Sequence, residues 1–189
     1  MVPVAVTTSA LTQGPGILYR GTFGQAEPAD TQVNTAPAAS GWTDVGGTLG
    51  GVNLTVSQKY KELEGDQIVD TVGRRLVNRE AGLETDLAEP TLANLALTLN
   101  ASVPVTGAGF ASYDPPNDNS AATPTYCALI FDGIAPGGFT RRIFLRRSLS
   151  VADAKFSYAK DKQSVFSVSF AAHYVSSAIR PFRVVDATA

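Results

Sequence analysis

Four glycines within six positions are the first feature of the sequence that could carry chemistry. The stretch DVGGTLGGVNLTV, residues 44–56, contains Gly46, Gly47, Gly50 and Gly51. Glycine-rich loops that bind phosphate either end in Gly-Lys-Ser/Thr or connect a buried strand to a helix. This stretch lacks the lysine and leads into alternating apolar and polar residues, a pattern typical of a strand. It therefore predicts a turn with positive φ angles, acting as a hinge into that strand.

Residues suited to catalysis or metal binding are few. The single histidine, His173, lies on the polar face of a predicted strand, and the sequence shows no nucleophile or orienting carboxylate for it. The single cysteine, Cys127, lies in the apolar run YCALIF, which predicts a buried, unreactive thiol. The acidic and amide side chains of residues 114–119 lack the spacing and closing Glu of a calcium loop. We expect no enzymatic activity, no cofactor and no metal.

Two clusters of opposite charge are the stronger signal. The acidic cluster consists of Glu62, Glu64, Asp66 and Asp70, and the basic cluster of Arg141, Arg142, Arg146 and Arg147 in RRIFLRR, with Arg74 and Arg75 as further cations. The basic cluster could be a solvated strand face. Separated opposite charges on one chain also suit head-to-tail self-association, in which one copy's acidic loop meets the next copy's basic strand.

The elements that would position these residues are mainly strands. Alternation predicts strands at 51–60 and 71–86, joined by a connecting loop or hairpin tip at 61–70. Apolar runs and alternation together predict further strands between 125 and 186, including one over 154–160. One helix is expected over 90–100, with Pro90 in its first position and Asn100 as a left-handed stop. The pattern indicates an antiparallel β-sandwich or open barrel flanked by one α-helix.

We expect residues 1–189 to form a single domain. Residues 1–45 are poor in large apolar side chains, which predicts an N-terminal arm with loops, ordered mainly by a partner; ILYRGTF, residues 17–23, could dock as a short strand. Residues 104–124 are expected to form a long loop.

Composition excludes some functions. Hydrophobic residues make up 44 % and charged residues 17 %, with a net charge of −2 and a pI near 5.3, so the chain is not built to bind nucleic-acid phosphates tightly. No signal peptide or membrane-spanning run is recognisable, so we expect a soluble chain made in a reducing cytoplasm.

Three stretches together carry a family resemblance. They are GWTDVGGTLGGVNLTVSQKYKELEGDQIVDTVGRRL, LAEPTLANLALTLN and RRIFLRRSLSVADAKFSYAKDKQSVFSVSFAAHYVSSAIRPFRVVD. They resemble the major tail tube proteins of long, non-contractile-tailed (siphovirus-type) phages, especially those infecting actinobacteria. The resemblance covers most of residues 15–186.

The resemblance implies a structural virion protein of the phage tail. Hexameric rings would stack into a tube, assembled in the host cytoplasm, through which double-stranded DNA is ejected without specific binding. The inner strands would be 51–60, 71–86, 139–147 and 163–174, and the summed charge of the side chains facing the lumen should be neutral or negative. Partners by resemblance are the tape measure protein, the tail terminator and the baseplate or distal tail proteins.

Two alternatives remain open at this point. A ring-forming tail terminator would share the fold but cap the tube. A monomeric ligand-binding β-barrel, from a different class of protein, would have a largely apolar pocket.

Overall fold

The computed structural model describes residues 10–65, 68–101, 104–115, 117 and 123–188. Its strands, in chain order, are β1 Ile17–Thr22, β2 Thr43–Asp44, β3 Thr48–Gly65, β4 Ile68–Leu87, β5 Val105–Gly107, β6 Phe110–Ser112, β7 Cys127–Ile134, β8 Thr140–Ser150, β9 Phe166–Ala172 and β10 Phe182–Asp186. The α-helix α1 spans Leu92–Thr98, and short 3₁₀ turns span Asp30–Gln32 and Pro136–Gly138. The described residues thus contain ten strands and one α-helix, as the predicted mainly-β class requires.

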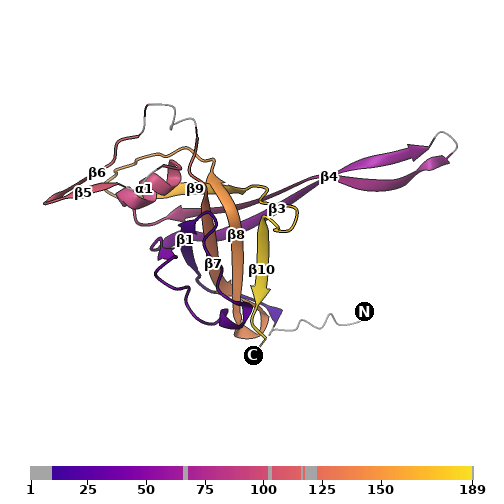
Figure 1. The fold of residues 1–189 in the computed structure, drawn as a ribbon, viewed down its shortest axis with the longest axis horizontal. Coiled ribbons are helices and arrows are strands. Elements are labelled where there is room, and N and C mark those ends of the chain that lie inside the picture. Colours follow the sequence, from indigo (N-terminus) through magenta and orange to yellow (C-terminus); the bar gives the residue numbers. More distant parts are fainter. Residues whose placement is uncertain (1–9, 66–67, 102–103, 116, 118–122, 189) are drawn as a thin grey trace.

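The main sheet is antiparallel, with the strand order β2-β1-β7-β8-β9-β4-β3. It divides at β8, because residues 148–150 of that strand pair with β9 whereas residues 141–145 pair with β10. The strand β8 therefore belongs to both parts of a sandwich-like body, and α1 covers one side of it (Figure 1). The antiparallel architecture with one helix confirms the predicted fold class.

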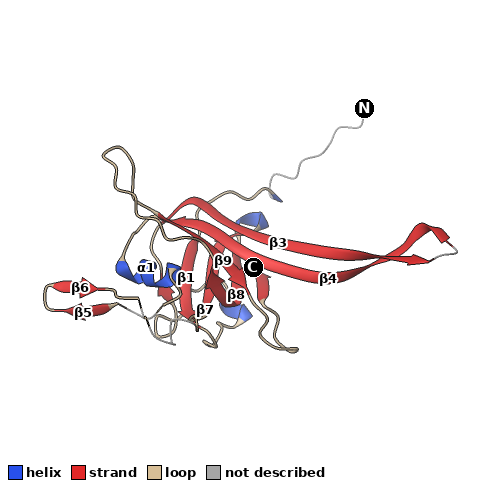
Figure 2. Cartoon of the chain, turned by 90° about the horizontal axis from the view of Figure 1, so that it is seen from above, coloured by secondary structure: helices blue, strands red, loops and turns tan. Residues whose placement is uncertain are grey.

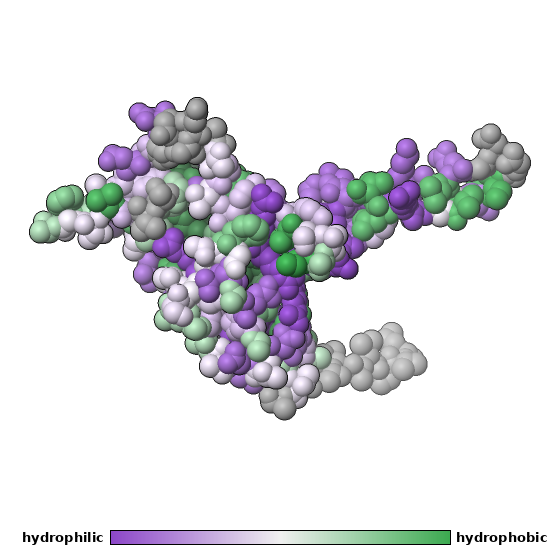
Figure 3. Space-filling model, viewed as in Figure 1, coloured by the Kyte–Doolittle hydropathy of each residue, from purple (hydrophilic) through white to green (hydrophobic). Residues whose placement is uncertain are grey.

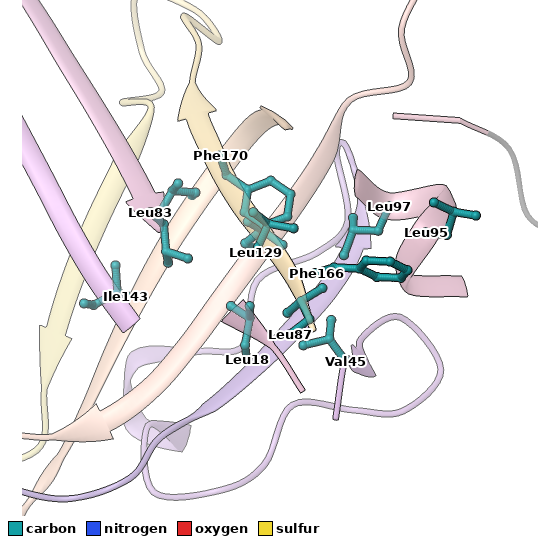
Figure 4. Close-up of a cluster of buried hydrophobic side chains, with 12 residues drawn as sticks. Leu18, Val45, Leu83, Leu87, Leu95, Leu97, Leu129, Ile143, Phe166 and Phe170 are labelled. Carbon is teal, nitrogen blue, oxygen red and sulfur yellow. The ribbon is translucent and has the colours of Figure 1, made fainter. Parts of the chain in front are cut away.

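The main hydrophobic core lies between the sheet and α1. Figure 4 shows Leu83 and Leu87 of β4 beside Leu129, Phe166 and Phe170, all from strands far apart in the sequence. A second, smaller cluster on the other side of the sheet consists of Trp42, Ala128, Ile130 and Phe144. With apolar side chains covered on both sides, β7 and β8 form the centre of the body.

The helix begins at Leu92, two residues after the predicted start. Thr91 is the N-cap, and its hydroxyl accepts a hydrogen bond from the backbone N–H of Asn94 at 3.2 Å, so Pro90 stays outside the helix. The buried amide of Asn94 donates 2.8 Å hydrogen bonds to the carbonyls of Val45 and Glu89, which ties the helix to the strand before it. Asn100 has φ 52°, so the left-handed stop is confirmed.

The prediction of an N-terminal arm over 1–45 is wrong for most of that range. Residues 17–23 do dock as a strand, since β1 pairs with β7 over six residues. Leu18, Val33, Trp42 and Val45 are all buried, so the few large apolar side chains of this segment suffice to pack it into the body. Residues 1–9 lie outside the described residues.

Three predicted loops and strands also need correction. Residues 61–65 and 68–70 belong to β3 and β4, which keep pairing almost to the turn, so of the two alternatives for 61–70 the hairpin tip is confirmed and the connecting loop is wrong. The expected loop at 104–124 contains the small hairpin β5–β6. Residues 154–160 form no extended strand and contribute only to an isolated bridge between Ala159 and Lys162.

Candidate assembly surface

The long hairpin of β3 and β4 leaves the body and projects into solvent (Figures 1 and 2). Its base belongs to the core, since β9 pairs with β4 at residues 82–87. Beyond that point the two strands pair only with each other, down to Gly65 opposite Ile68. We call residues 56–81 the ribbon; about ten residue pairs at roughly 3.4 Å each make it about 30 Å long.

Each side of the ribbon has a distinct character. One side continues the core-facing side of β4 and carries apolar residues in alternation with charged pairs: Val56, Tyr60, Glu62 and Glu64 on β3, with Val72, Arg74, Leu76 and Arg79 on β4. The other side is mostly polar, with Ser57, Lys59 and Lys61 on β3 and Arg75, Asn78 and Glu80 on β4, and it carries one exposed leucine, Leu63, near the tip. Figure 3 shows hydrophobic and hydrophilic patches succeeding one another along the ribbon.

Large apolar side chains stay exposed on the ribbon. The exposed ones are Val56, Tyr60, Leu63, Ile68, Val69, Val72, Leu76 and Val77, with Val69 fully exposed. A lone two-stranded hairpin is marginally stable in water, and contiguous exposed apolar surface marks an interaction site. The ribbon is therefore the strongest candidate for a surface that another molecule covers.

The pairing of β3 with β4 has three register shifts, one of them between Leu63 and Gly65 at the tip, and the other two bend the ribbon and its base. One lies between Leu49 and Asn53, where Gly50 and Gly51 have φ angles of 75° and 87°. The other lies between Lys59 and Tyr60, where Val77 is the extra residue on β4. Bulges of this kind increase the local twist and redirect a strand, so the glycines set the direction in which the ribbon leaves the body.

The remaining predicted hinge glycines act in the turn before β3. Gly46 has φ 88°, and its N–H donates to Asp44 at 2.8 Å. Gly47 donates to the carboxylate of Glu89 at 3.0 Å. The prediction of a turn with positive φ leading into a strand is confirmed.

The acidic cluster lies at the tip of the ribbon. Glu62 accepts a hydrogen bond from Arg74 on the paired strand, at 2.7 Å from Nη2. Glu64, Asp70 and Arg75 are exposed and form no salt bridge within the described ranges. Asp66 lies outside those ranges. Of the acidic cluster, the structure thus brings only Glu62 together with Arg74, directly opposite it within the same hairpin.

The basic cluster of β8 is used inside the chain. Arg142 is 1 % exposed and forms hydrogen bonds of 2.6 Å with both carboxylate oxygens of Asp132, and further bonds to the carbonyls of Gln32 and Thr35. Its burial makes it inaccessible to a neighbouring copy, and the interpretation of RRIFLRR as a solvated face is wrong.

The other three arginines of β8 also have intramolecular contacts. Arg146 pairs with Glu27, and Arg141 pairs with Asp186, directly opposite on β10, through two bonds of 2.7 Å. Arg147 stacks on the ring of Tyr126, 3.9 Å from its centroid, and donates to the carbonyl of Tyr174. Hydrogen bonds from Arg141 lower the pKa of the Asp186 carboxyl and raise the pKa of Arg141.

Residues with catalytic potential occupy structural positions. His173 follows β9, and its ring meets Tyr126 edge-on with centroids 5.4 Å apart. Burial raises the pKa of the Cys127 thiol, which contacts the hydroxyl of Ser148 at 3.2 Å. Among the described residues no group of three or more His, Cys, Asp or Glu is arranged to hold a metal ion. No helix in the described part of the chain is long and apolar enough to span a membrane.

Sequence reasoning missed one surface, the segment between β8 and β9. Residues 151–165 were expected to contain a strand, but they form an exposed loop with a turn between Ala159 and Lys162. The loop presents Phe156 and Tyr158, which are 55 % and 83 % exposed. The sequence feature that could have identified this surface is the presence of three lysines among the eight residues 155–162.

Comparisons with known proteins give limited information. No protein-family model matches the chain, and no curated protein is a match. Among solved structures, the chain is similar to one in the "Cryo-EM structure of the anti-feeding prophage (AFP) baseplate, 6-fold symmetrised", with 10 % identity, a TM-score of 0.47, and coverage of 98 % of this chain and 97 % of that one. Likeness at this level says nothing about activity or partners.

Proposed function

We propose that this chain is a structural protein of a phage tail, whose copies assemble into hexameric rings that stack to form the tail tube. The ribbon is the observation that carries the proposal. It exposes eight large apolar side chains and holds them away from the body on a hairpin that its own chain does not cover. Such a surface fits a protein whose final state is an assembly.

The unpaired strand edges support assembly between copies. β3 ends the sheet, so its outer edge is free along its length, and the outer edge of β4 is free beyond its pairing with β9. Free edges on long strands are aggregation liabilities unless another strand covers them. Around a ring, the β3 edge of one copy would meet the β4 edge of the next in antiparallel orientation, which closes the ring by a heterologous contact.

The polar side of the ribbon fits a lumen through which DNA passes. Together with the base of the hairpin, that side carries three cations, Lys59, Lys61 and Arg75, and three carboxylates, Glu80, Glu84 and Asp86. Equal numbers of opposite charges offer no net attraction to DNA phosphates. Sequence resemblance supplies the six-fold symmetry, the virion location and the partner proteins: tape measure, terminator and baseplate or distal tail proteins.

A non-enzymatic role agrees with the chemistry of the body. His173, Cys127 and the arginines of β8 contact structural partners, and the contacts described for them contain no nucleophile–base pair. We therefore propose no catalytic activity, no cofactor and no metal requirement.

The alternative of a ligand-binding barrel has less support. Within the described residues the sheet stays open, with β2 at one end and β3 at the other. Two pockets with mainly apolar lining have volumes of about 240 and 250 Å³, below the roughly 300–1,000 Å³ of typical ligand sites. A further pocket of about 690 Å³ falls within that range, but glycine, threonine and other small or polar residues form most of its lining, which does not fit the largely apolar pocket of such a barrel.

Electron microscopy of the purified chain tests the proposal. Long tubes are the expected result, single rings would identify a terminator-like protein, and a stable monomer of about 20 kDa would contradict both. A variant in which residues 58–79 are replaced by Asn-Gly keeps the pairs of Val56 with Ala81 and of Leu54 with Leu83. We expect it to fold, by circular dichroism, but to form no tubes.

A further inference from the structure

The tip of the ribbon needs a partner surface on another copy. Between residues 62 and 70 the sequence has four carboxylates and no cation. The same tip exposes Leu63, Ile68 and Val69. A complementary surface must therefore combine cations without partners with exposed apolar side chains.

The arginines of β8 do not meet that requirement. Arg142 is buried, Arg141 and Arg146 hold their own carboxylates, and Arg147 lies on Tyr126. Recruiting any of them would first break a contact within the chain. The arginine strand that the sequence predicted as the partner of the acidic cluster is therefore already engaged in contacts within its own chain.

The loop of residues 151–165 combines both properties. Its three lysines, Lys155, Lys160 and Lys162, are exposed and form no salt bridge within the described ranges, and its two carboxylates, Asp153 and Asp161, leave the loop a net charge of +1. Phe156 and Tyr158 supply the exposed apolar surface. The loop therefore has a net positive charge beside aromatic rings, opposite in charge to the tip.

Contacts with the body hold this loop in place. The ring of Phe156 meets the buried Phe166 edge-on, with centroids 5.1 Å apart. Gln163 donates to the carbonyl of Ala88 at 3.1 Å, and the hydroxyl of Ser164 donates to the carbonyl of Ser157. A surface held in this way loses little entropy on binding.

The loop and the tip lie at opposite ends of the molecule. The loop enters β9 at Phe166, which pairs with Leu87, the end of β4 farthest from the tip. Ala154 packs on the core cluster that includes Leu95 and Leu97 of α1, and α1 lies at the end away from the ribbon (Figures 1 and 2). In a head-to-tail stack, one rotation and translation relates each copy to the next. Each copy must therefore use two different surfaces, one at each end, to contact its two neighbours.

We propose that the ribbon tip of one copy docks on the 151–165 loop of a copy in the adjacent ring, with its carboxylates facing the lysines and its aliphatic side chains covering Phe156 and Tyr158. This inference rests on the proposed tube function and names the surface that the ribbon binds. The charges orient the contact and speed its formation, while burial of apolar area supplies most of the affinity.

Charge exchange tests the pairing. The tip variant Glu64→Lys/Asp70→Lys and the loop variant Lys160→Glu/Lys162→Glu should each fold but form no tubes by electron microscopy. The chain carrying all four substitutions should recover tubes, since the charges are complementary again. Arg180→Glu, on an exposed loop outside both surfaces, is the control and should form tubes like the unmodified chain.

A disulfide cross-link gives an independent measurement. A chain with Leu63→Cys and Tyr158→Cys should form a ladder of linked multimers on a non-reducing gel after assembly. Either cysteine alone should give no ladder. Burial keeps the Cys127 thiol protonated and slow to react, so the native cysteine should contribute little background.

The outcomes separate the two proposals. If the unmodified chain forms no tubes, the proposed tube function fails and this inference fails with it. If it forms tubes, but the tip and loop variants assemble equally well or the four-fold variant does not recover, the docking surface is wrong and the proposed function stands.

Discussion

The two halves of β4 differ in what covers them, although they form one strand. Residues 81–87 alternate between buried and exposed positions, and Leu83 and Leu87 are fully buried in the core. Residues 68–80 are exposed on nearly every position, including Val69 and Val72. Both halves contain large apolar side chains, at 68, 69, 72, 76 and 77 in one and at 83 and 87 in the other, so the presence of apolar residues in a strand does not show whether the same chain covers them.

Ion pairs show the same contrast. The pair of Arg142 with Asp132 lies in the body with side chains 1 % and 14 % exposed, whereas the pair of Arg74 with Glu62 lies on the ribbon at 63 % and 47 %. The two ion pairs have similar geometry, with N–O distances of 2.6 and 2.7 Å. The energetic consequences should differ, because solvent screens the exposed pair. Four sets of substitutions test these differences.

The largest effect is expected at Arg142. Arg142→Ala would leave Asp132 and two backbone carbonyls without their donor in a buried site, which should lower the free energy of unfolding by about 3–5 kcal/mol. Arg74→Ala on the ribbon should cost at most about 1 kcal/mol. Urea denaturation of both variants measures their free energies of unfolding. Equal losses of stability would contradict the expected difference between the buried and the exposed ion pair.

A leucine in each half of the hairpin gives the second comparison. Leu83→Ala removes a fully buried side chain and should lower the free energy of unfolding by about 2–5 kcal/mol. Leu63→Ala changes a side chain that is 49 % exposed, so monomer stability should change by about 0.5 kcal/mol or less. Tube yield, measured by sedimentation, should instead fall for Leu63→Ala. A large loss of monomer stability there would show that the ribbon packs on its own body.

Backbone strain at the base of the ribbon should have an intermediate effect. Gly50→Val forces a β-branched residue to φ near 75°, at a cost of about 1–3 kcal/mol, and no neighbouring atom lies within 4 Å of the added Cβ to compensate. Gly73→Ala is the matched control, because its added Cβ would lie 3.9 Å from Leu63 and needs no positive φ. Thermal unfolding followed by circular dichroism distinguishes them. Equal melting temperatures would mean that Gly50 does not require its left-handed conformation.

The smallest effect concerns the pH dependence of stability. The pKa of Asp186 is lowered in the folded protein by Arg141, so its contribution is present above the unfolded pKa of about 3.9 and is lost as pH falls below it. Asp186→Asn should therefore make stability fall less steeply below about pH 4. Both side chains are more than a third exposed, so the change should be small.

Much of the fold was predictable from local patterns. Alternation located β3, β4 and β9, an apolar run located β7, and the left-handed Asn100 ended the helix where expected. The failures occurred where long-range contacts decided the outcome. Residues 17–45 join the body because a few apolar side chains, such as Leu18 and Trp42, find partners there, and residues 154–160 alternate without a neighbouring strand to pair with.

The candidate site was predictable only in part. The acidic cluster and the hinge glycines were recognisable from composition and spacing, and the glycines adopt the expected positive φ at Gly46, Gly50 and Gly51. The proposed partner surface was not. The arginines of residues 141–147 are closely spaced in the sequence, but they contact other residues of the body. The lysines of residues 155–162 are exposed and form no salt bridge within the described ranges.

The sequence by itself determined the mainly-β class, the turn at the glycines, the helix stop and the opposite charges of two segments. These depend on interactions within a few residues: side-chain alternation, backbone angles and local charge density. Only the tertiary structure decided that the acidic segment is the tip of a projecting ribbon and that the basic strand is buried. Burial depends on which distant strands pair, and strand order cannot be derived from local pattern because pairing joins residues far apart in the chain.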